Sequence, residues 1–166
     1  MLELRVASLD HPHAVALNDE VQAYYARVYG EVDLTRLETA QFLAPRGTYL
    51  IGYDDGVPVV SGAWRSLDPA EAGGDPVRDG DAEIKRMYVV PAARGLGYAR
   101  ALLAGLERTA VEQGRTRMIL ETGTAQPDAI ALYRSSGYEA IAVFGEHRGD
   151  ERSRCFAKPL VPAPAP

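Results

Sequence analysis

Alternating apolar and polar residues predict β-strands in the first half of the chain. Leu2–Ala7 alternates with a period of two residues, as a half-buried strand does. Two further apolar segments, 48–53 and 57–64, flank the turn residues Asp54–Gly56, an arrangement typical of a β-hairpin. We therefore expect one strand and, after a gap, a hairpin.

The gap between these strands has a helical period. From Val15 to Val28, apolar residues recur at spacings that fit one face of a helix, and Gly30 can end that helix. Apolar positions between residues 34 and 42 predict a second, short helix. Two helices are therefore expected before the hairpin.

The centre of the chain predicts a strand, a glycine-containing turn and a helix. Residues 82–90 have the composition of a strand, and the turn follows at Pro91–Gly97. Gly114 is expected to close the helix. The apolar stripe that defines this helix consists of Ala99, Leu102, Leu103, Leu106 and Ala110.

The last third predicts a strand at 116–122, a short helix at 127–133 and a final pair of strands at 138–144 and 154–158. Segment 68–81 is rich in Pro, Gly and Asp and has no period, so we expect an exposed loop there. Strands and helices in this order predict an α+β or mixed α/β fold with a mixed sheet.

Composition indicates one domain. The chain has 166 residues, 46% of them hydrophobic, which is enough for one sizeable core, so we expect a single domain over residues 1–160. The Pro/Ala-rich residues 161–166 predict an extended, disordered tail.

The net charge and the length of the apolar runs limit which binding partners and which cellular location we expect for the protein. With 18 basic and 23 acidic residues the net charge is −5, and no block of Lys or Arg suggests a nucleic-acid-binding face. No apolar run approaches the roughly 20 residues that span a membrane. The polar start of the chain lacks the pattern of a signal peptide, so we expect a cytosolic protein. The single cysteine, Cys155, is expected to be a small buried residue on a late strand and not a nucleophile.

The turn before the central helix suits an anionic ligand. Glycines in Arg94–Ala99 let the backbone approach a ligand closely, and the unpaired N–H groups of the first helical turn favour negative charge. The alternative is an ordinary helix start that uses glycine only for its conformation. No Gly-Lys-Ser/Thr follows, which excludes a Walker loop, and Arg100 stands where a dinucleotide loop needs its third glycine.

Here the sequence resembles a known family. Glu83–Pro91 followed by Arg94–Ala99 is similar to the central motif of the GNAT superfamily of acyl-CoA-dependent N-acetyltransferases. The family pattern Gln/Arg-x-x-Gly-x-Gly/Ala is matched by Arg94, Gly97 and Ala99.

A second segment, 129–138, is similar to the next motif of that family, and the resemblance covers about residues 48–158. It implies a mostly antiparallel central sheet flanked by helices, with a splayed strand pair at the CoA site. It also implies acetyl-CoA as the acyl donor, an amine of a small molecule or protein as the acceptor, no metal, and a possible homodimer.

The resemblance assigns a cofactor site. Amides of the glycine-containing turn would bind the pyrophosphate of CoA, and the backbone of the preceding strand would pair with its pantetheine arm. The cations of Arg94 and Arg100 would contact the negative charge of a pyrophosphate. Arg100 is equally compatible with a solvated helix position. The implied cofactor-binding residues are Met87, Tyr88, Val89, Arg94, Gly95, Leu96, Gly97, Tyr98, Ala99, Arg100 and Tyr133.

The resemblance also assigns two catalytic residues. Glu83 occupies the strand position from which many family members draw a general base, which an ammonium of pKa near 10 requires. Tyr133 matches the tyrosine that can protonate the leaving thiolate, although it could instead be a core aromatic residue on the helix stripe with Ile130. A strand N–H within Met87–Val89 would stabilise the carbonyl oxygen. Glu121 is the rival base, while Glu83 could instead be solvated or ion-paired.

Other assignments stay open at the level of sequence. His147 could contact a substrate or be an exposed loop histidine, and the acidic loop 68–81 could attract a cationic amine or be merely solvated. A non-catalytic acyl-CoA-binding or sensor module of the same fold is the main alternative function. A protein that binds another diphosphate through Arg94–Ala99 is a third.

Overall fold

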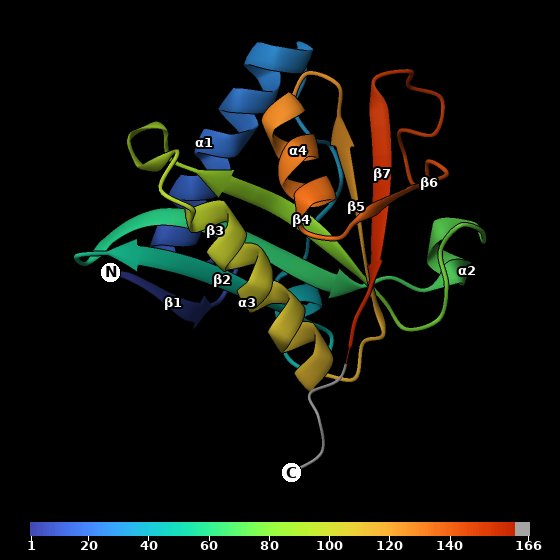
Figure 1. Ribbon diagram of the computed structural model, residues 1–166, viewed down its shortest axis with the longest axis horizontal. Coiled ribbons are helices and arrows are strands. Elements are labelled where there is room, and N and C mark those ends of the chain that lie inside the picture. The colour runs from blue at the N-terminus through green and yellow to red at the C-terminus, as the bar shows by residue number, and fades with distance from the viewer. Residues whose placement is uncertain (162–166) are drawn as a thin grey trace.

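A computed structural model describes residues 1–161 as a central sheet with helices on both faces (Figure 1). The sheet has seven strands in the spatial order β1-β2-β3-β4-β5-β7-β6, and every neighbouring pair is antiparallel except β4 and β5. The predicted mixed, mostly antiparallel sheet is therefore confirmed. The strands are β1 (Leu2–Ala7), β2 (Gly47–Asp54), β3 (Val57–Ser66), β4 (Asp81–Val89), β5 (Arg117–Gly123), β6 (Glu139–Ile141) and β7 (Ser153–Pro159).

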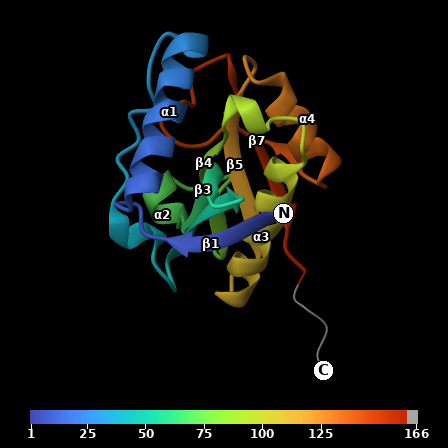
Figure 2. The same ribbon diagram turned by 90° about the vertical axis from the view of Figure 1, so that its left-hand side faces the viewer.

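The two faces of the sheet are covered by different helices (Figure 2). One face is covered by α1 (Pro12–Tyr29), and the opposite face by α3 (Tyr98–Glu112) and α4 (Pro127–Ser135). Both α1 and α4 begin with a proline, whose fixed backbone angle suits a first helical position. The short α2 (Pro69–Ala72) precedes β4.

Each covered face has its own hydrophobic core. On one side, Leu102, Leu103 and Leu106 of α3 are buried against Leu50 and Trp64 of the sheet. On the other side, the buried residues of α1 pack on the opposite face of the same strands, and these residues are Ala14, Leu17 and Val21. Since both faces are buried, the middle strands are apolar almost throughout.

The parallel pair β4–β5 is joined along only part of its length. Pairing runs from Asp81 opposite Arg117 to Ile84 opposite Leu120 and stops there, although both strands continue. Just beyond that point, β4 contains a bulge opposite β3, at which Arg86 has a φ of 57°. A bulge bends its strand. The two strands therefore separate at their carboxyl ends, and β4 has no hydrogen-bonded neighbour on that edge.

The structure corrects three of the predicted elements. Only a 3₁₀ turn, Thr39–Phe42, forms where a short helix was expected over 34–42, because the preceding residues are extended and tied to α1 by two hydrogen bonds between Gln22 and Asp33. The strand expected at 138–144 is limited to β6, which pairs with β7 only over Glu139–Ile141; Phe144 beyond it is buried against Ile119 of β5 and Cys155 of β7.

The segment 68–81 is not wholly an exposed loop. It contains α2, and its last residue, Asp81, is fully buried at the start of β4, where it pairs with Arg117 at 2.7 Å. Val77 is buried as well. Of the predicted disordered tail, residues 161–166, all but Val161 lies outside the described residues. Cys155 is buried on β7 as expected, and burial raises the pKa of its thiol to about 12.

Candidate active site

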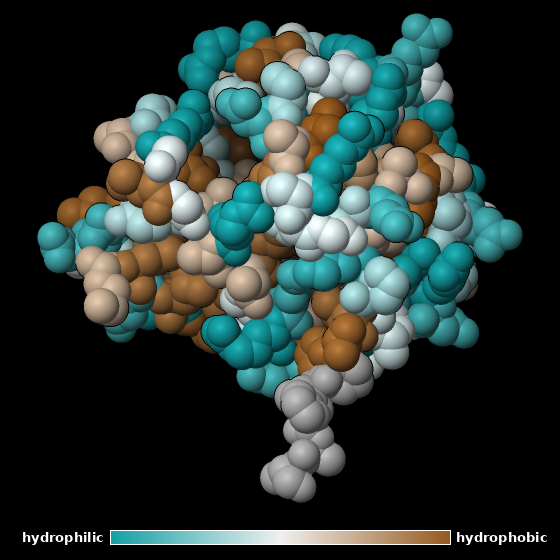
Figure 3. All heavy atoms as spheres, viewed as in Figure 1, coloured by the Kyte–Doolittle hydropathy of each residue, from teal (hydrophilic) through white to brown (hydrophobic). Residues whose placement is uncertain are grey.

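A cleft opens where β4 and β5 separate. It has a volume of about 510 Å³ and is bordered by the ends of both strands, the start of α3, α4 and one side of α1. In the space-filling view the molecular face is hollowed between α1, α4 and the start of α3 (Figure 3). Most predicted cofactor-binding residues line this cleft, namely Met87, Tyr88, Val89, Arg94, Gly95, Gly97, Tyr98, Ala99, Arg100 and Tyr133. Leu96 does not line it, and its side chain is 60% exposed.

The start of α3 has the properties of an anion site. Gly95 and Gly97 have φ angles of +80° and +81°, and a Cβ on either would project into open space. Within the described chain, the backbone N–H groups from Gly95 to Arg100 have no hydrogen-bond acceptor, and the first helical bond is donated by Ala101. These free donors at a helix N-terminus suit a pyrophosphate.

Two arginines border the same cleft. Arg94 Nε donates a 3.2 Å hydrogen bond to the Val89 carbonyl, and its guanidinium lies over the rings of Tyr24 and Tyr88. These contacts hold one positive charge beside the free amides. Arg100 donates to the hydroxyls of two serines in and after α4, Ser135 and Ser136, at 2.9 and 3.0 Å. Arg100 thereby connects the two helices at the cleft.

Tyr133 is buried in the wall of the cleft. Its hydroxyl donates to the Met87 sulfur at 3.6 Å, so a sulfur acceptor already lies within its reach. Burial raises the pKa of this tyrosine, which keeps its hydroxyl protonated at neutral pH. The structure thus brings the Tyr133 hydroxyl next to Met87, on the unpaired edge of β4.

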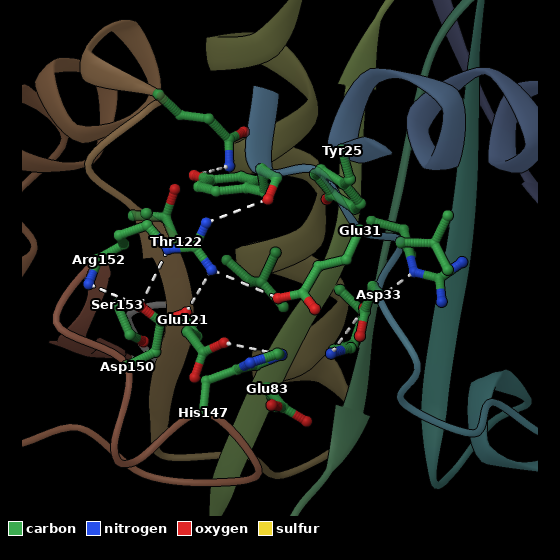
Figure 4. A pocket seen from close by; sticks show the side chains of 17 residues that line it. Tyr25, Glu31, Asp33, Glu83, Glu121, Thr122, His147, Asp150, Arg152 and Ser153 are labelled. Atoms are coloured by element: carbon green, nitrogen blue, oxygen red, sulfur yellow. Dashed lines mark hydrogen bonds and ion pairs between the residues drawn. The ribbon is translucent and has the colours of Figure 1, made fainter. Parts of the chain in front are cut away.

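A second, smaller cavity of about 120 Å³ lies on the other side of the gap (Figure 4). Charged side chains from the α1–β2 segment, β4, β5 and the β6–β7 segment surround it. The two cavities share a set of lining residues and so meet between the separated strands. The shared residues are Tyr25, Ile84, Arg86, Glu121, Thr122 and Gln126.

Glu121 stands at this junction. It is the carboxylate that lines both cavities, and His147 Nε2 lies 3.8 Å from its Oε1. Burial raises the pKa of Glu121, although His147 and Lys85 partly oppose the shift. A carboxylate with a raised pKa is a better proton acceptor at neutral pH than an ordinary one.

Glu83 lies deeper and faces the smaller cavity only. It is 6% exposed, and its Oε1 accepts a 3.0 Å hydrogen bond from Arg65, which also donates to Gln41. Both carboxylates named from the sequence therefore reach the smaller cavity, but Glu83 is engaged in an ion pair and Glu121 is not paired with Lys or Arg within residues 1–161.

Comparison with known proteins agrees with this geometry. The sequence model of the acetyltransferase (GNAT) family matches residues 14–138. The chain belongs to the GNAT family. Members of this family use acetyl-CoA as the acetyl donor.

Individual relatives support the same assignment. This GNAT protein is 32% identical over 146 residues to an IAA acetyltransferase of Azospirillum brasilense, covering 88% of this chain and 90% of the relative. It is 28% identical to the solved structure of an acyl-CoA N-acyltransferase of Klebsiella pneumoniae, with a TM-score of 0.77 and coverage of 97% and 99%.

A more distant structure shows the same fold. The PaiA N-acetyltransferase of Thermoplasma acidophilum, solved in complex with coenzyme A, has a TM-score of 0.67 at 12% identity and covers 96% of this chain and 99% of its own. At this identity the likeness shows the fold, whereas the assignment as an acetyltransferase rests on the family match.

Several residues of the smaller cavity in this GNAT protein were not found from the sequence. Asp33 pairs with Lys85 at 3.4 Å and with Arg86 at 3.2 Å; burial alone would raise its pKa, but these cations and hydrogen bonds from Thr35 lower it. Arg152 pairs with Asp150 and lowers the pKa of that carboxyl to about 2. The charges of segments 31–33 and 147–152 were the available signal, but nothing local shows that segments so far apart in sequence face each other.

Other candidates lie away from the GNAT site. The acidic loop 68–81, Asp54 and Asp55 line neither cavity, and Asp54 instead accepts a hydrogen bond from Tyr98. The part of the chain that the structure describes contains no cluster of three or more His, Cys, Asp or Glu residues arranged to hold a metal ion. None of the helices within residues 1–161 combines the length and the apolar character needed to cross a membrane.

Proposed function

We propose that this acetyltransferase moves the acetyl group of acetyl-CoA to a primary amine by direct attack while both substrates are bound. One observation carries the proposal: a large cleft with free helix-start amides and a small charged cavity meet in the gap between β4 and β5. Acetyl-CoA would occupy the former and the amine the latter, so that the reacting atoms meet beside Glu121. Holding two reactants in one place removes much of the entropic barrier of a bimolecular reaction.

The cofactor's pyrophosphate would be held by the amides from Gly95 to Arg100, with Arg94 supplying a cation. The donors are free and the glycines leave room for close approach. The acyl-bearing arm would lie against the unpaired edge of β4 over 87–89, where backbone groups can hydrogen-bond an extended ligand. CoA thereby supplies the activated acetyl group, and the protein orients it.

Glu121 is our preferred base. An ammonium would give one proton to this carboxylate, and the neutral nitrogen would form the new C–N bond as the C–S bond breaks. The nitrogen gives up a second proton as the amide forms. One proton ends on the CoA sulfur and one in solvent, so the overall reaction releases one proton. Glu83 remains a prediction as the base; its ion pair with Arg65 supports a role in fixing the floor of the cavity.

The remaining roles fall to β4 and Tyr133. An N–H of the unpaired edge at 87–89 would stabilise negative charge on the carbonyl oxygen. Tyr133 keeps its proton because of its burial, and its hydroxyl lies where it can donate to a sulfur atom, as it does to Met87. It would donate that proton to the leaving thiolate and then be reprotonated from solvent.

The proposal is tested by two measurements on one preparation. Calorimetric titration with acetyl-CoA, CoA, ATP and NAD should show binding of the two CoA species only. Thiol release across a panel of amines should then be amine-dependent, with the acetylated product identified by mass. Binding without release would favour a sensor, and preference for ATP or NAD would contradict the assignment of the cleft.

A further inference from the structure

The smaller cavity limits the size of an acceptor. Its volume of about 120 Å³ corresponds to roughly eight to twelve water-sized groups. Contacts between distant segments border it: Arg152 donates to the Tyr29 carbonyl at 3.1 Å and pairs with Glu31 at 3.4 Å, and Gln126 donates to the Tyr29 hydroxyl at 2.9 Å. These contacts join the end of α1 to the segments before α4 and β7. The space fits a compact molecule better than a polypeptide.

The charges around the cavity are nearly compensated. Lys85 and Arg86 both pair with Asp33. Arg152 pairs with two carboxylates, and Figure 4 shows it between Asp150 and Glu31. The five carboxylates that line the cavity are Glu31, Asp33, Glu83, Glu121 and Asp150, and the cations that line it are Lys85, Arg86 and Arg152.

Behind this wall, Arg65 compensates Glu83. With Arg65 included, four cations face five carboxylates, and within residues 1–161 Glu121 is the one that has no Lys or Arg within 4 Å. Its charged neighbour at 3.8 Å is His147, which carries a positive charge only when protonated. The cavity as a whole therefore carries one net negative charge. Glu121, which has no Lys or Arg partner in the described chain, lies at the junction with the cofactor cleft, where the reacting nitrogen would be.

Aromatic groups complete the lining. Tyr25 and Tyr29, one turn apart at the end of α1, both line the cavity, and their ring centroids are 6.4 Å apart. The electron-rich faces of such rings attract cations, and Arg152 already lies over the Tyr29 ring, 5.5 Å from its centroid. Size and net charge therefore describe the occupant.

We infer that the acceptor is a compact primary amine that carries one positive charge and no carboxylate. The inference rests on the proposed function, since it assigns the smaller cavity to the acceptor. A single ammonium would compensate Glu121. A carboxylate on the acceptor would cancel the positive charge that balances the cavity, and a second ammonium would exceed the one net negative charge.

Three amines on one four-carbon scaffold test the charge, and a peptide tests the size. Butylamine, 4-aminobutanoate, 1,4-diaminobutane and a pentapeptide with a free amino terminus are compared by kcat/KM for thiol release, together with acetyl-CoA binding. We expect butylamine to exceed each of the others at least tenfold. Equal or better use of 4-aminobutanoate, the diamine or the peptide would overturn the inference and leave the proposed function standing.

The remaining outcomes also separate the two claims. If acetyl-CoA binds but butylamine does not react, the inference about the acceptor fails. If acetyl-CoA does not bind at all, it is the proposed function that fails.

A variant of Arg152 tests the charge argument within the protein. Arg152→Ala leaves Asp150 and Glu31 without their cation, so the ratio of kcat/KM for 1,4-diaminobutane to that for butylamine should rise at least threefold. Arg152→Lys keeps the charge and should leave this ratio near the wild-type value. An unchanged ratio in Arg152→Ala, or an equal rise in Arg152→Lys, would show that the charge balance does not select the acceptor.

Discussion

The two ends of the β4–β5 pair differ although the same two strands form both. At the amino ends the strands are paired and closed by Asp81 and Arg117, a buried two-bond ion pair with N–O distances of 2.8 and 2.7 Å. At the carboxyl ends they are separate, and Glu121 faces a gap without a Lys or Arg partner among the described residues. One end satisfies its charges internally, and the other leaves charge and backbone donors available to a ligand.

The difference shows that the paired end stabilises the fold and that the open end can bind a ligand. A buried carboxylate that is fully paired has little chemistry left to offer, whereas an unpaired one at the edge of a cavity can take a proton. Substitutions at the paired end should therefore change stability, and substitutions at the open end should change activity. The following substitutions test this difference between the two ends, in order of decreasing expected effect.

Glu121→Gln should have the largest effect. Removal of the base is expected to lower kcat for amine-dependent thiol release by about 10²- to 10⁴-fold, which is the usual contribution of general-base catalysis. The dissociation constant of acetyl-CoA should not change. Glu83→Gln is the matched comparison, with a smaller loss of kcat expected; a larger loss in Glu83→Gln would identify that carboxylate as the base.

Arg117→Met tests the paired end. The substitution leaves Asp81 fully buried without its cation, which typically costs about 3–5 kcal/mol of unfolding free energy. Urea denaturation followed by circular dichroism measures this loss. Arg5→Met is the control, because the Arg5–Glu3 pair is exposed and such pairs contribute about 0–1 kcal/mol. Similar losses of unfolding free energy in both variants would contradict the conclusion that the paired end stabilises the fold.

Gly97→Ala tests the cofactor end of α3. A residue with a side chain at a φ of +81° should cost about 1–2 kcal/mol of stability, and its Cβ would project into the cleft and lower acetyl-CoA affinity about tenfold. Gly114→Ala, just beyond the other end of α3, has a φ of +80° and equally open surroundings. It should lose similar stability without any change in affinity, as calorimetry can show.

Features that depend on residues close together in sequence were predictable, whereas features that depend on contacts between distant residues were not. The stripe of Leu102, Leu103 and Leu106 and the glycine-containing turn are local patterns, so the central strand, turn and helix were predicted correctly. The extent of the gap depends on the bulge at Arg86, which the strand pattern does not reveal.

The two cavities of the candidate site differ in the same respect. The residues of the cofactor cleft follow one another along β4 and α3, and a family motif identifies them. The wall of the smaller cavity joins residues such as Glu31 and Arg152, which are 121 positions apart. Their pairing is a consequence of the complete fold and has no local signature.

The smallest expected effect concerns the pH dependence of stability. Burial raises the pKa of Glu121, so between the unfolded-state pKa and the folded-state pKa the folded protein binds more protons, and the contribution of this group to stability falls as pH rises. Glu121→Gln removes that contribution. We expect the variant to gain stability relative to wild type between pH 4 and pH 7, beginning near the usual pKa of about 4.3. Urea denaturation at intervals across this range measures the difference. If the variant instead loses stability relative to wild type as pH rises, favourable contacts must stabilise Glu121 as a charged carboxylate. Asp81 is stabilised in that way at the paired end, and Glu121 at the open end should not be.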